Sequence, residues 1–236
     1  MIRSYRFHLS TPLSSTAAYP LYAALLEQTP KAYAARLHES TVTPVSQYVS
    51  GSTWQVSLFG REAIDTLAPV LDTVQEVFLR REQTLVGLKM DSVEGIPSVD
   101  ALLNAPDCGR GTLNFVTPTA FKSGGVYQLL PTQRLVMQSL ILKWNGCFGD
   151  VCPIEDEGGG LEALAEGLRY QSVHLDSRQY SLKHTQIPGI LGSVAFDLRL
   201  EGFHRQLAGA LLHFGTCSGL GIKTALGMGG LQITTK

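Results

Sequence analysis

The chain has 236 residues, of which 44% are hydrophobic and 17% are charged, and its formal net charge is −1. This composition is typical of one large or two small folded domains and argues against long disordered segments. A net charge so close to zero also argues against a protein that coats nucleic acid non-specifically, although a local basic groove is compatible with it.

The first half of the chain has the pattern of one βαββαβ unit. Period-two alternation predicts strands, and apolar residues at helical spacing predict helices. Thr29-Pro30 marks a helix start, with Thr as the N-cap and Pro at the first helical position. The expected elements, in chain order, are a strand at 2–10, a helix around 21–26, a short helix ending near His38, a hairpin of 42–50 and 53–59 around Gly51, a helix at 63–74 and a strand at 84–94. This order is that of the ferredoxin-like unit.

A similar order begins again after a boundary that the segment 106–111 (PDCGRG) predicts. The expected elements are an extended stretch at 112–130, a helix at 132–144, an exposed linker at 149–160, a short helix at 161–168, strands near 171–184 and 190–200, a helix at 203–214 and a strand at 228–234. We therefore predict an α+β fold of two tandem ferredoxin-like (RRM-like) βαββαβ domains, at residues 1–105 and 106–236.

The sequence gives no sign of membrane insertion or secretion. Its first ten residues alternate like a strand and lack the apolar core of a signal peptide, and no stretch approaches the roughly 20 apolar residues of a membrane span. The cysteines show neither a C-x-x-C pair nor the spacing of a zinc site or disulfide framework; they are Cys108, Cys147, Cys152 and Cys217. We expect a cytoplasmic protein with reduced cysteines.

A glycine-rich segment lies near the end of the sequence. Residues 219–229 read GLGIKTALGMG, in which two Gly-hydrophobic-Gly units flank five residues that include Lys223. Glycine lets backbone N–H groups approach a phosphate and permits positive φ angles. Ile222 separates Gly221 from Lys223, which excludes a Walker A loop, and a dinucleotide-binding fingerprint lacks its third glycine and its acidic residue. Alternatively, this segment has no binding function and is only a glycine-rich turn that packs a helix against the last strand.

Several segments, in the same order along nearly the whole chain, resemble one family. GLGIKTALGMG is similar to the C-terminal G-h-G-x₅-G-h-G signature, with an internal lysine, of the CRISPR-associated repeat-processing endoribonucleases of the RAMP superfamily. Other segments that resemble this family are Leu37-His38-Glu39, Phe115–Phe121 (FVTPTAF), Leu130-Pro131, Trp144-Asn145 and 189–194 (GILGSV).

The resemblance implies that the protein binds the repeat segment of a CRISPR transcript, single-stranded or as a hairpin, and cuts it without a metal or other cofactor. It also implies that the glycine-rich segment binds RNA, through Gly219, Gly221, Lys223, Thr224, Gly227 and Gly229. Other expected partners are subunits of a CRISPR effector complex, and the chain is expected to be a monomer or a homodimer.

Metal-independent RNA cleavage needs a proton removed from a 2′-OH and a proton given to the departing 5′-oxygen, which leaves a 2′,3′-cyclic phosphate and a 5′-hydroxyl. A histidine suits either transfer. His38 is the best candidate, because the family match falls on it and the C-terminus of a helix favours an imidazolium. Tyr33 and Arg36 are its candidate helpers. No lysine follows His38 before Lys89, so the flanking lysine of some family members has no counterpart, and the charge-stabilising group stays open.

Two other functions are compatible with the same residues. A non-catalytic guide-RNA-binding subunit of a CRISPR effector complex would share the fold and the glycine-rich segment but would not cleave RNA. An enzyme acting on a small phosphate metabolite would bind a nucleotide more tightly than RNA.

Overall fold

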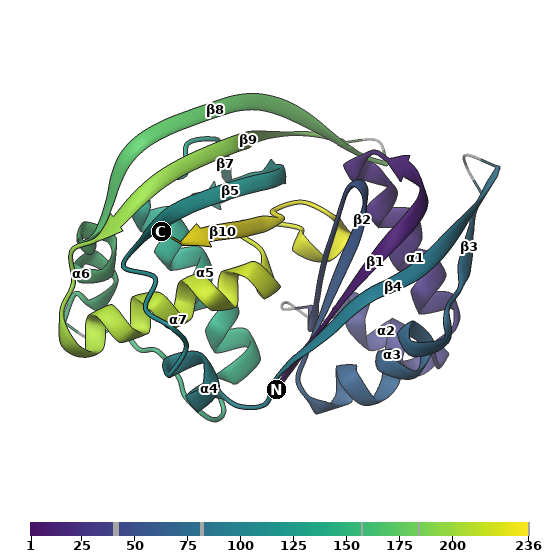
Figure 1. Cartoon of the computed structure of the whole chain (residues 1–236), viewed down its shortest axis with the longest axis horizontal. Coiled ribbons are helices and arrows are strands. Elements are labelled where there is room, and N and C mark those ends of the chain that lie inside the picture. Colours follow the sequence, from purple (N-terminus) through teal and green to yellow (C-terminus); the bar gives the residue numbers. More distant parts are fainter. Residues whose placement is uncertain (40–42, 81–82, 157, 184, 236) are drawn as a thin grey trace.

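The computed structural model describes residues 1–39, 43–80, 83–156, 158–183 and 185–235. Two four-stranded antiparallel sheets lie side by side, and helices pack against each of them (Figure 1). A separate two-stranded hairpin accompanies the second sheet. The prediction of an α+β fold with tandem ferredoxin-like units is confirmed.

The first sheet has the strand order β2-β1-β4-β3. Its unit comprises β1 (Ile2–Leu13), η1 (Ser15–Ala17), α1 (Ala18–Glu27), α2 (Lys31–Glu39), β2 (Val45–Phe59), α3 (Arg61–Thr73), β3 (Glu76–Leu79) and β4 (Thr84–Ile96). The element β2 folds back on itself at Gly51, which has φ 59°, and the Phe59 N–H donates to the Pro44 carbonyl at 3.0 Å. The predicted hairpin is therefore confirmed, and its second arm pairs with β1.

The second sheet has the strand order β10-β5-β9-β8. Its unit comprises α4 (Val99–Leu103), β5 (Arg110–Thr119), β6 (Phe121–Ser123), β7 (Val126–Gln128), α5 (Gln133–Phe148), α6 (Gly160–Gly167), β8 (Leu168–Leu182), β9 (Thr185–Leu198), α7 (Gly202–Ser218), η2 (Thr224–Leu226) and β10 (Leu231–Thr235). Helix α5 begins where the sequence predicts, because the Thr132 side chain accepts the Leu135 N–H as an N-cap.

The two units share a packed interior. Ile2 and Phe59, from the first sheet, belong to the same buried apolar cluster as Trp144 of α5 and Phe214 of α7. The Phe59 and Phe214 rings meet edge to face with their centroids 5.7 Å apart, an arrangement that aromatic quadrupoles favour. The division into domains at residues 1–105 and 106–236 remains a proposal, and apolar contacts join the two units across it.

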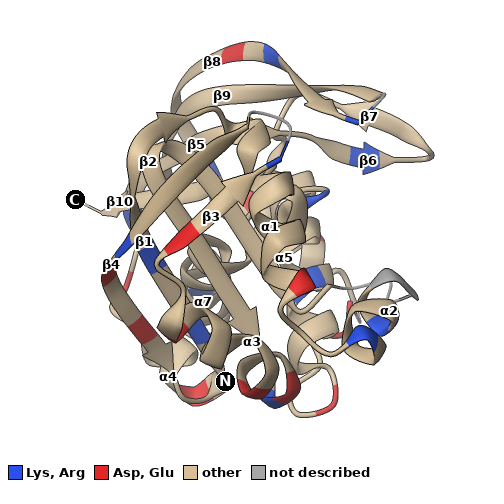
Figure 2. Ribbon diagram, turned by 90° about the vertical axis from the view of Figure 1, so that its right-hand side faces the viewer, with Lys and Arg blue, Asp and Glu red and all other residues tan. Residues whose placement is uncertain are grey.

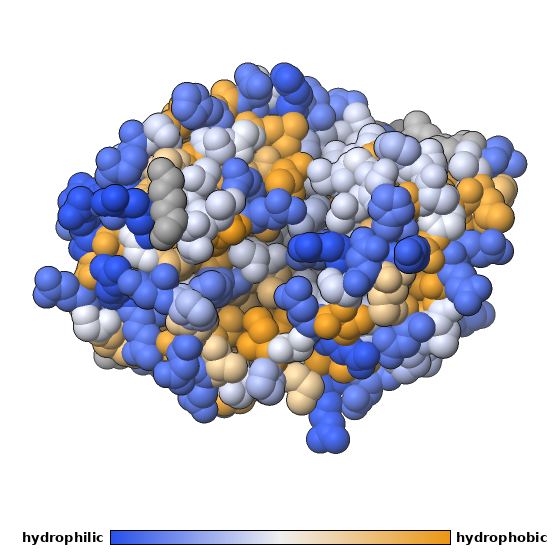
Figure 3. Space-filling view, viewed as in Figure 1, coloured by the Kyte–Doolittle hydropathy of each residue, from blue (hydrophilic) through white to orange (hydrophobic). Residues whose placement is uncertain are grey.

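The surface is that of an ordinary globular protein. On the face in Figure 3, hydrophobic side chains form separate patches among polar ones. None of the helices in the described ranges is long and apolar enough to cross a membrane.

Candidate functional site

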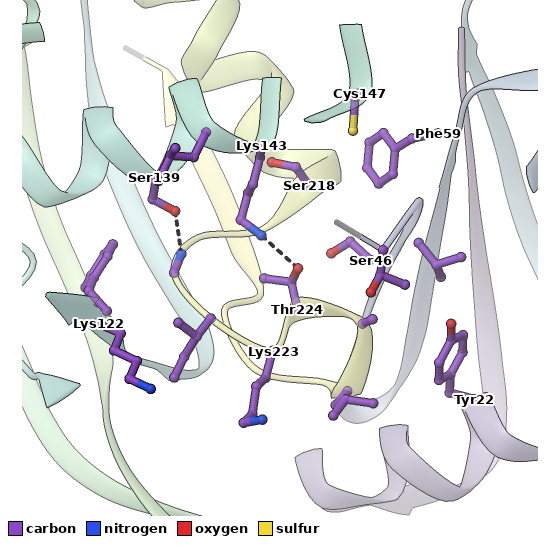
Figure 4. A pocket seen from close by; sticks show the side chains of 18 of the residues that line it. Tyr22, Ser46, Phe59, Lys122, Ser139, Lys143, Cys147, Ser218, Lys223 and Thr224 are labelled. Atoms are coloured by element: carbon purple, nitrogen blue, oxygen red, sulfur yellow. Dashed lines mark hydrogen bonds between the residues drawn. The ribbon is translucent and has the colours of Figure 1, made fainter. Parts of the chain in front are cut away.

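A cavity of about 560 Å³ lies where the two units meet. The first unit contributes residues of α1, α2 and β2 to its wall, and the second contributes β6, α5 and the loop that contains η2 (Figure 4). Its polar and charged lining residues include Tyr22, Ser46, Lys122, Ser139, Lys143, Lys223 and Thr224. The site is thus built from segments that are far apart in the sequence.

The charged residues that are described in the lining of the cavity are all basic. Among the described residues that line it are three lysines, Lys122, Lys143 and Lys223, and no aspartate or glutamate. Figure 2 shows basic positions in β6, which carries Lys122, and in α2. A concave site whose charged lining residues are all basic has a positive potential that attracts an anion such as a phosphate group.

Lys143 is the most constrained of these cations. It lies on α5, is half-buried, and its Nζ donates a hydrogen bond to Thr224 Oγ1 at 2.9 Å (Figure 4). Burial lowers the pKa of this ammonium to about 8, and the nearby Cys147 partly opposes that shift. No local motif singles out Lys143 in the sequence, because its contact joins α5 to a loop 81 residues away.

The glycine-rich loop owes its shape to left-handed backbone conformations. Gly221 has φ 72° and Gly229 has φ 74°, while Lys223 adopts φ 54° without being a glycine. A Cβ on Gly221 would lie 2.1 Å from the Ala120 carbonyl oxygen, and one on Gly229 would lie 2.0 Å from that of Leu220. Both positions therefore require glycine for steric as well as conformational reasons.

Most N–H groups of this loop bind the protein itself. The Gly221 N–H donates to Ser139 Oγ at 2.8 Å, Ile222 donates to the Ala120 carbonyl at 2.9 Å, and Gly229 donates to that of Pro118 at 3.1 Å. In the described part of the chain, only the N–H groups of Lys223, Thr224 and Ala225 in the stretch 219–226 lack a protein acceptor. The Gly227 N–H likewise has no acceptor among the described residues, so in the loop 219–229 a backbone contact to a phosphate can come only from these four positions.

A buried glutamine ties this loop to the first unit. Gln47 Nε2 donates to the carbonyls of Ala18 at 2.6 Å and Ala225 at 2.9 Å, and Gln47 Oε1 accepts the Trp54 indole N–H at 2.6 Å. Both N–H groups of the Gln47 amide donate and its oxygen accepts, so this side chain ties the loop to β2 and α1.

The predicted RNA-binding residues fall into two groups. Gly221, Lys223 and Thr224 line the cavity. Gly219, Gly227 and Gly229 do not line it, and a Cβ on Gly227 would meet Ala18 at 2.4 Å. This second group shapes the loop through close backbone packing.

None of the predicted catalytic residues has a described side chain that lines the cavity. Leu37 lines it, and α2 continues through position 38, but the side chain of His38 lies outside the described residues. Tyr33 and Arg36 do not line it. The Tyr33 hydroxyl is buried without a hydrogen-bond partner among the described residues, and Arg36 lies over the Tyr33 ring and pairs with Glu62. Burial, with a smaller effect of Glu62, raises the pKa of Tyr33 to about 12, so this phenol is neutral at physiological pH.

The other histidines lie elsewhere. None of those with described side chains lines the cavity; they are His8, His174, His204 and His213. His213 Nε2 lies 2.9 Å from the carbonyl oxygen of Pro106, and neither residue lines the cavity. Within the described residues, no group of three or more His, Cys, Asp and Glu side chains could hold a metal ion.

Comparisons with known proteins agree on one family. The family model described as "CRISPR-associated endoribonuclease Cas6" matches residues 113–231. The CRISPR-associated endoribonuclease Cas6 of Mycobacterium tuberculosis is 31% identical over 224 residues, which cover 90% of this chain and 70% of that protein. The Cas6 of Streptococcus thermophilus is 29% identical over 222 residues, 92% of this chain and 90% of its own. A solved Cas6 product complex has the same fold, with a TM-score of 0.75, 24% identity and full coverage of both chains.

Proposed function

The chain belongs to the CRISPR-associated endoribonuclease Cas6 family, and from that premise we propose that it cleaves the repeat RNA of a CRISPR precursor transcript without a metal ion. In this proposal the 2′-hydroxyl attacks the adjacent phosphorus, and the bond from phosphorus to the 5′-oxygen breaks. The products are one RNA with a 2′,3′-cyclic phosphate and one with a 5′-hydroxyl.

The observation that carries the proposal is the cavity beside α2. It is lined by three lysines and no carboxylate among its described residues, and Leu37, the neighbour of His38, forms part of its wall. A phosphodiester placed there would meet only positive charge, which suits a reaction whose transition state gathers negative charge on the phosphate oxygens.

In the proposed mechanism His38 gives its proton to the departing 5′-oxygen. Helix α2 ends at Glu39, so its last carbonyls lie around position 38, and the negative end of the helix dipole favours the protonated imidazole. The described histidines do not line the cavity, which supports the choice of His38. Tyr33 and Arg36 support the packing of α2 against α3 in this proposal, because the hydroxyl is buried and the guanidinium pairs with Glu62.

The test is cleavage of a cognate repeat RNA by the full chain in excess EDTA. We expect cleavage at the rate seen without EDTA. The downstream fragment should accept phosphate from polynucleotide kinase without prior phosphatase treatment, as a 5′-hydroxyl does. Loss of cleavage in EDTA would show a metal-dependent reaction. Tight binding without cleavage under any of these conditions would instead favour the guide-RNA-binding subunit.

Lys223 gives a prediction about binding. We propose that its ammonium contacts an RNA phosphate, so Lys223→Ala should weaken RNA binding and reduce the slope of log affinity against log salt by about 0.7 to 1. The matched control is Lys183→Ala, because Lys183 has the same φ of 54° but does not line the cavity. Fluorescence anisotropy over a salt series measures both slopes, and equal slopes for the two variants would remove Lys223 from the RNA contacts.

A further inference from the structure

Lys143 lacks the partner that a half-buried lysine normally has. Nine ion pairs join described residues, and all of them use arginine. Lys143 donates instead to the neutral hydroxyl of Thr224, in a cavity whose described lining contains no carboxylate. Burying a charge without a counter-charge costs stability, so a purely structural position would favour an uncharged side chain of similar length.

The position of Lys143 suits a ligand that supplies the missing negative charge. Its Nζ extends from α5 toward Thr224 in the cavity (Figure 4), and Leu37 of α2 lines the same cavity. Ser139, one helical turn earlier, accepts the Gly221 N–H, so α5 and the glycine-rich loop are fixed to each other on both sides of the ammonium. The ammonium is therefore held in place before any RNA binds, as electrostatic catalysis requires.

We infer that Lys143 contacts the scissile phosphate of the repeat RNA and stabilises the negative charge that forms on its oxygens during cleavage. This inference rests on the proposed function. As the bond from the 2′-oxygen to phosphorus forms and the bond to the 5′-oxygen breaks, the 2′-hydroxyl proton leaves to a base and the 5′-oxygen gains one from the general acid. Lys143 keeps its proton throughout and acts only through its charge and its hydrogen bonds. The site would then combine a proton donor from the first unit with a cation from the second.

The first test compares single-turnover cleavage at saturating protein. We expect Lys143→Met to lower the cleavage rate constant about 100- to 1000-fold, the loss typical of removing one preorganised charge-stabilising group. Thr224→Val removes the hydrogen-bond acceptor of Lys143 and keeps the side-chain shape. If Lys143 only anchored the loop through Thr224, both variants would lose activity equally. A loss at least ten times larger in Lys143→Met is expected.

The second test is the pH profile, which an anchoring role would not change. Contact with the phosphate raises the pKa of Lys143 in the RNA complex above the value of about 8 that burial gives it in the free protein. At the pH above 8 where Lys143 then loses its proton, the wild-type slope of log rate against pH should become more negative by about one. Lys143→Arg should lack this break, since a guanidinium stays charged. The groups that share the cavity are Cys147, Lys122, Lys223 and Tyr22. Burial raises the pKa of both Cys147 and Tyr22. It lowers the pKa of the Met1 amino group, which lies near Cys147. Lys143→Arg leaves these three groups in place, so none of them explains a change of slope that this substitution removes.

The outcomes separate this inference from the proposed function. Thermal unfolding checks that Lys143→Met folds, and we expect a midpoint equal to or above that of the wild type. If this variant does not fold, the pH profile of Lys143→Arg decides. Wild-type protein that fails to cleave would overturn the proposed function. Wild-type cleavage with Lys143→Met within about threefold of it, or a break that persists in Lys143→Arg, would overturn the role of Lys143 alone.

Discussion

Replacing His38 with alanine is expected to lower the rate of repeat RNA cleavage by about 100- to 10,000-fold, the usual contribution of a positioned general acid or base. The physical reason is the leaving group. An alkoxide that departs without a proton is high in energy, and water cannot replace the imidazole at the same position and orientation. RNA affinity should change little, because the three cavity lysines that attract the phosphate stay in place.

The control for this variant is His204→Ala. His204 is exposed on α7 and does not line the cavity, so its replacement should leave both cleavage and binding unchanged. Single-turnover rates at saturating protein separate chemistry from binding, and a gel-shift titration gives the affinity. Cleavage by His38→Ala at the wild-type rate would exclude His38 from the mechanism, whereas parallel loss of binding and cleavage would make it an RNA contact instead.

The elements with strong local signals were predictable from the sequence. The hairpin at Gly51 and the start of α5 at Thr132 each follow from the conformational preferences of one residue, and both are confirmed. The short strand β3 was not predicted, and β6 and β7 were predicted only as part of one extended stretch at 112–130, because three or four residues are too few to show a period of two. The last strand begins at Leu231 rather than 228, since Gly229 still has the positive φ of the loop.

The candidate site was predictable only where a motif marks it. The glycine-rich segment and the Leu37-His38-Glu39 segment stand out in the sequence, and the structure brings Leu37 and the loop to one cavity. Lys143 does not stand out, because nothing local distinguishes a lysine that meets Thr224 from one that meets water. Nor does the sequence show that Ala120, Pro118 and Ser139 accept the loop's N–H groups, since these are long-range contacts.

The second large effect is expected for Gly221→Ala, which should lower the free energy of unfolding by more than about 3 kcal/mol or prevent folding. An alanine at φ 72° is already disfavoured by about 1–2 kcal/mol. Its Cβ would also lie 2.1 Å from the Ala120 carbonyl oxygen, and this is a backbone atom that cannot rotate away. That oxygen accepts the Ile222 N–H at 2.9 Å, so moving it breaks a contact that holds the loop.

Gly51→Ala is the matched control, since Gly51 also has a positive φ, 59°, but a Cβ there would meet nothing within 4 Å. It should therefore show only the conformational cost, about 1–2 kcal/mol, and urea unfolding of both variants measures the difference. Equal losses would mean that the loop moves easily and that its glycines are needed only for backbone angles. A larger loss in Gly221→Ala would instead show that the close contact with Ala120 fixes the loop. Since the same loop holds Thr224 against Lys143, a Gly221→Ala protein that still folds should cleave RNA more slowly than Gly51→Ala.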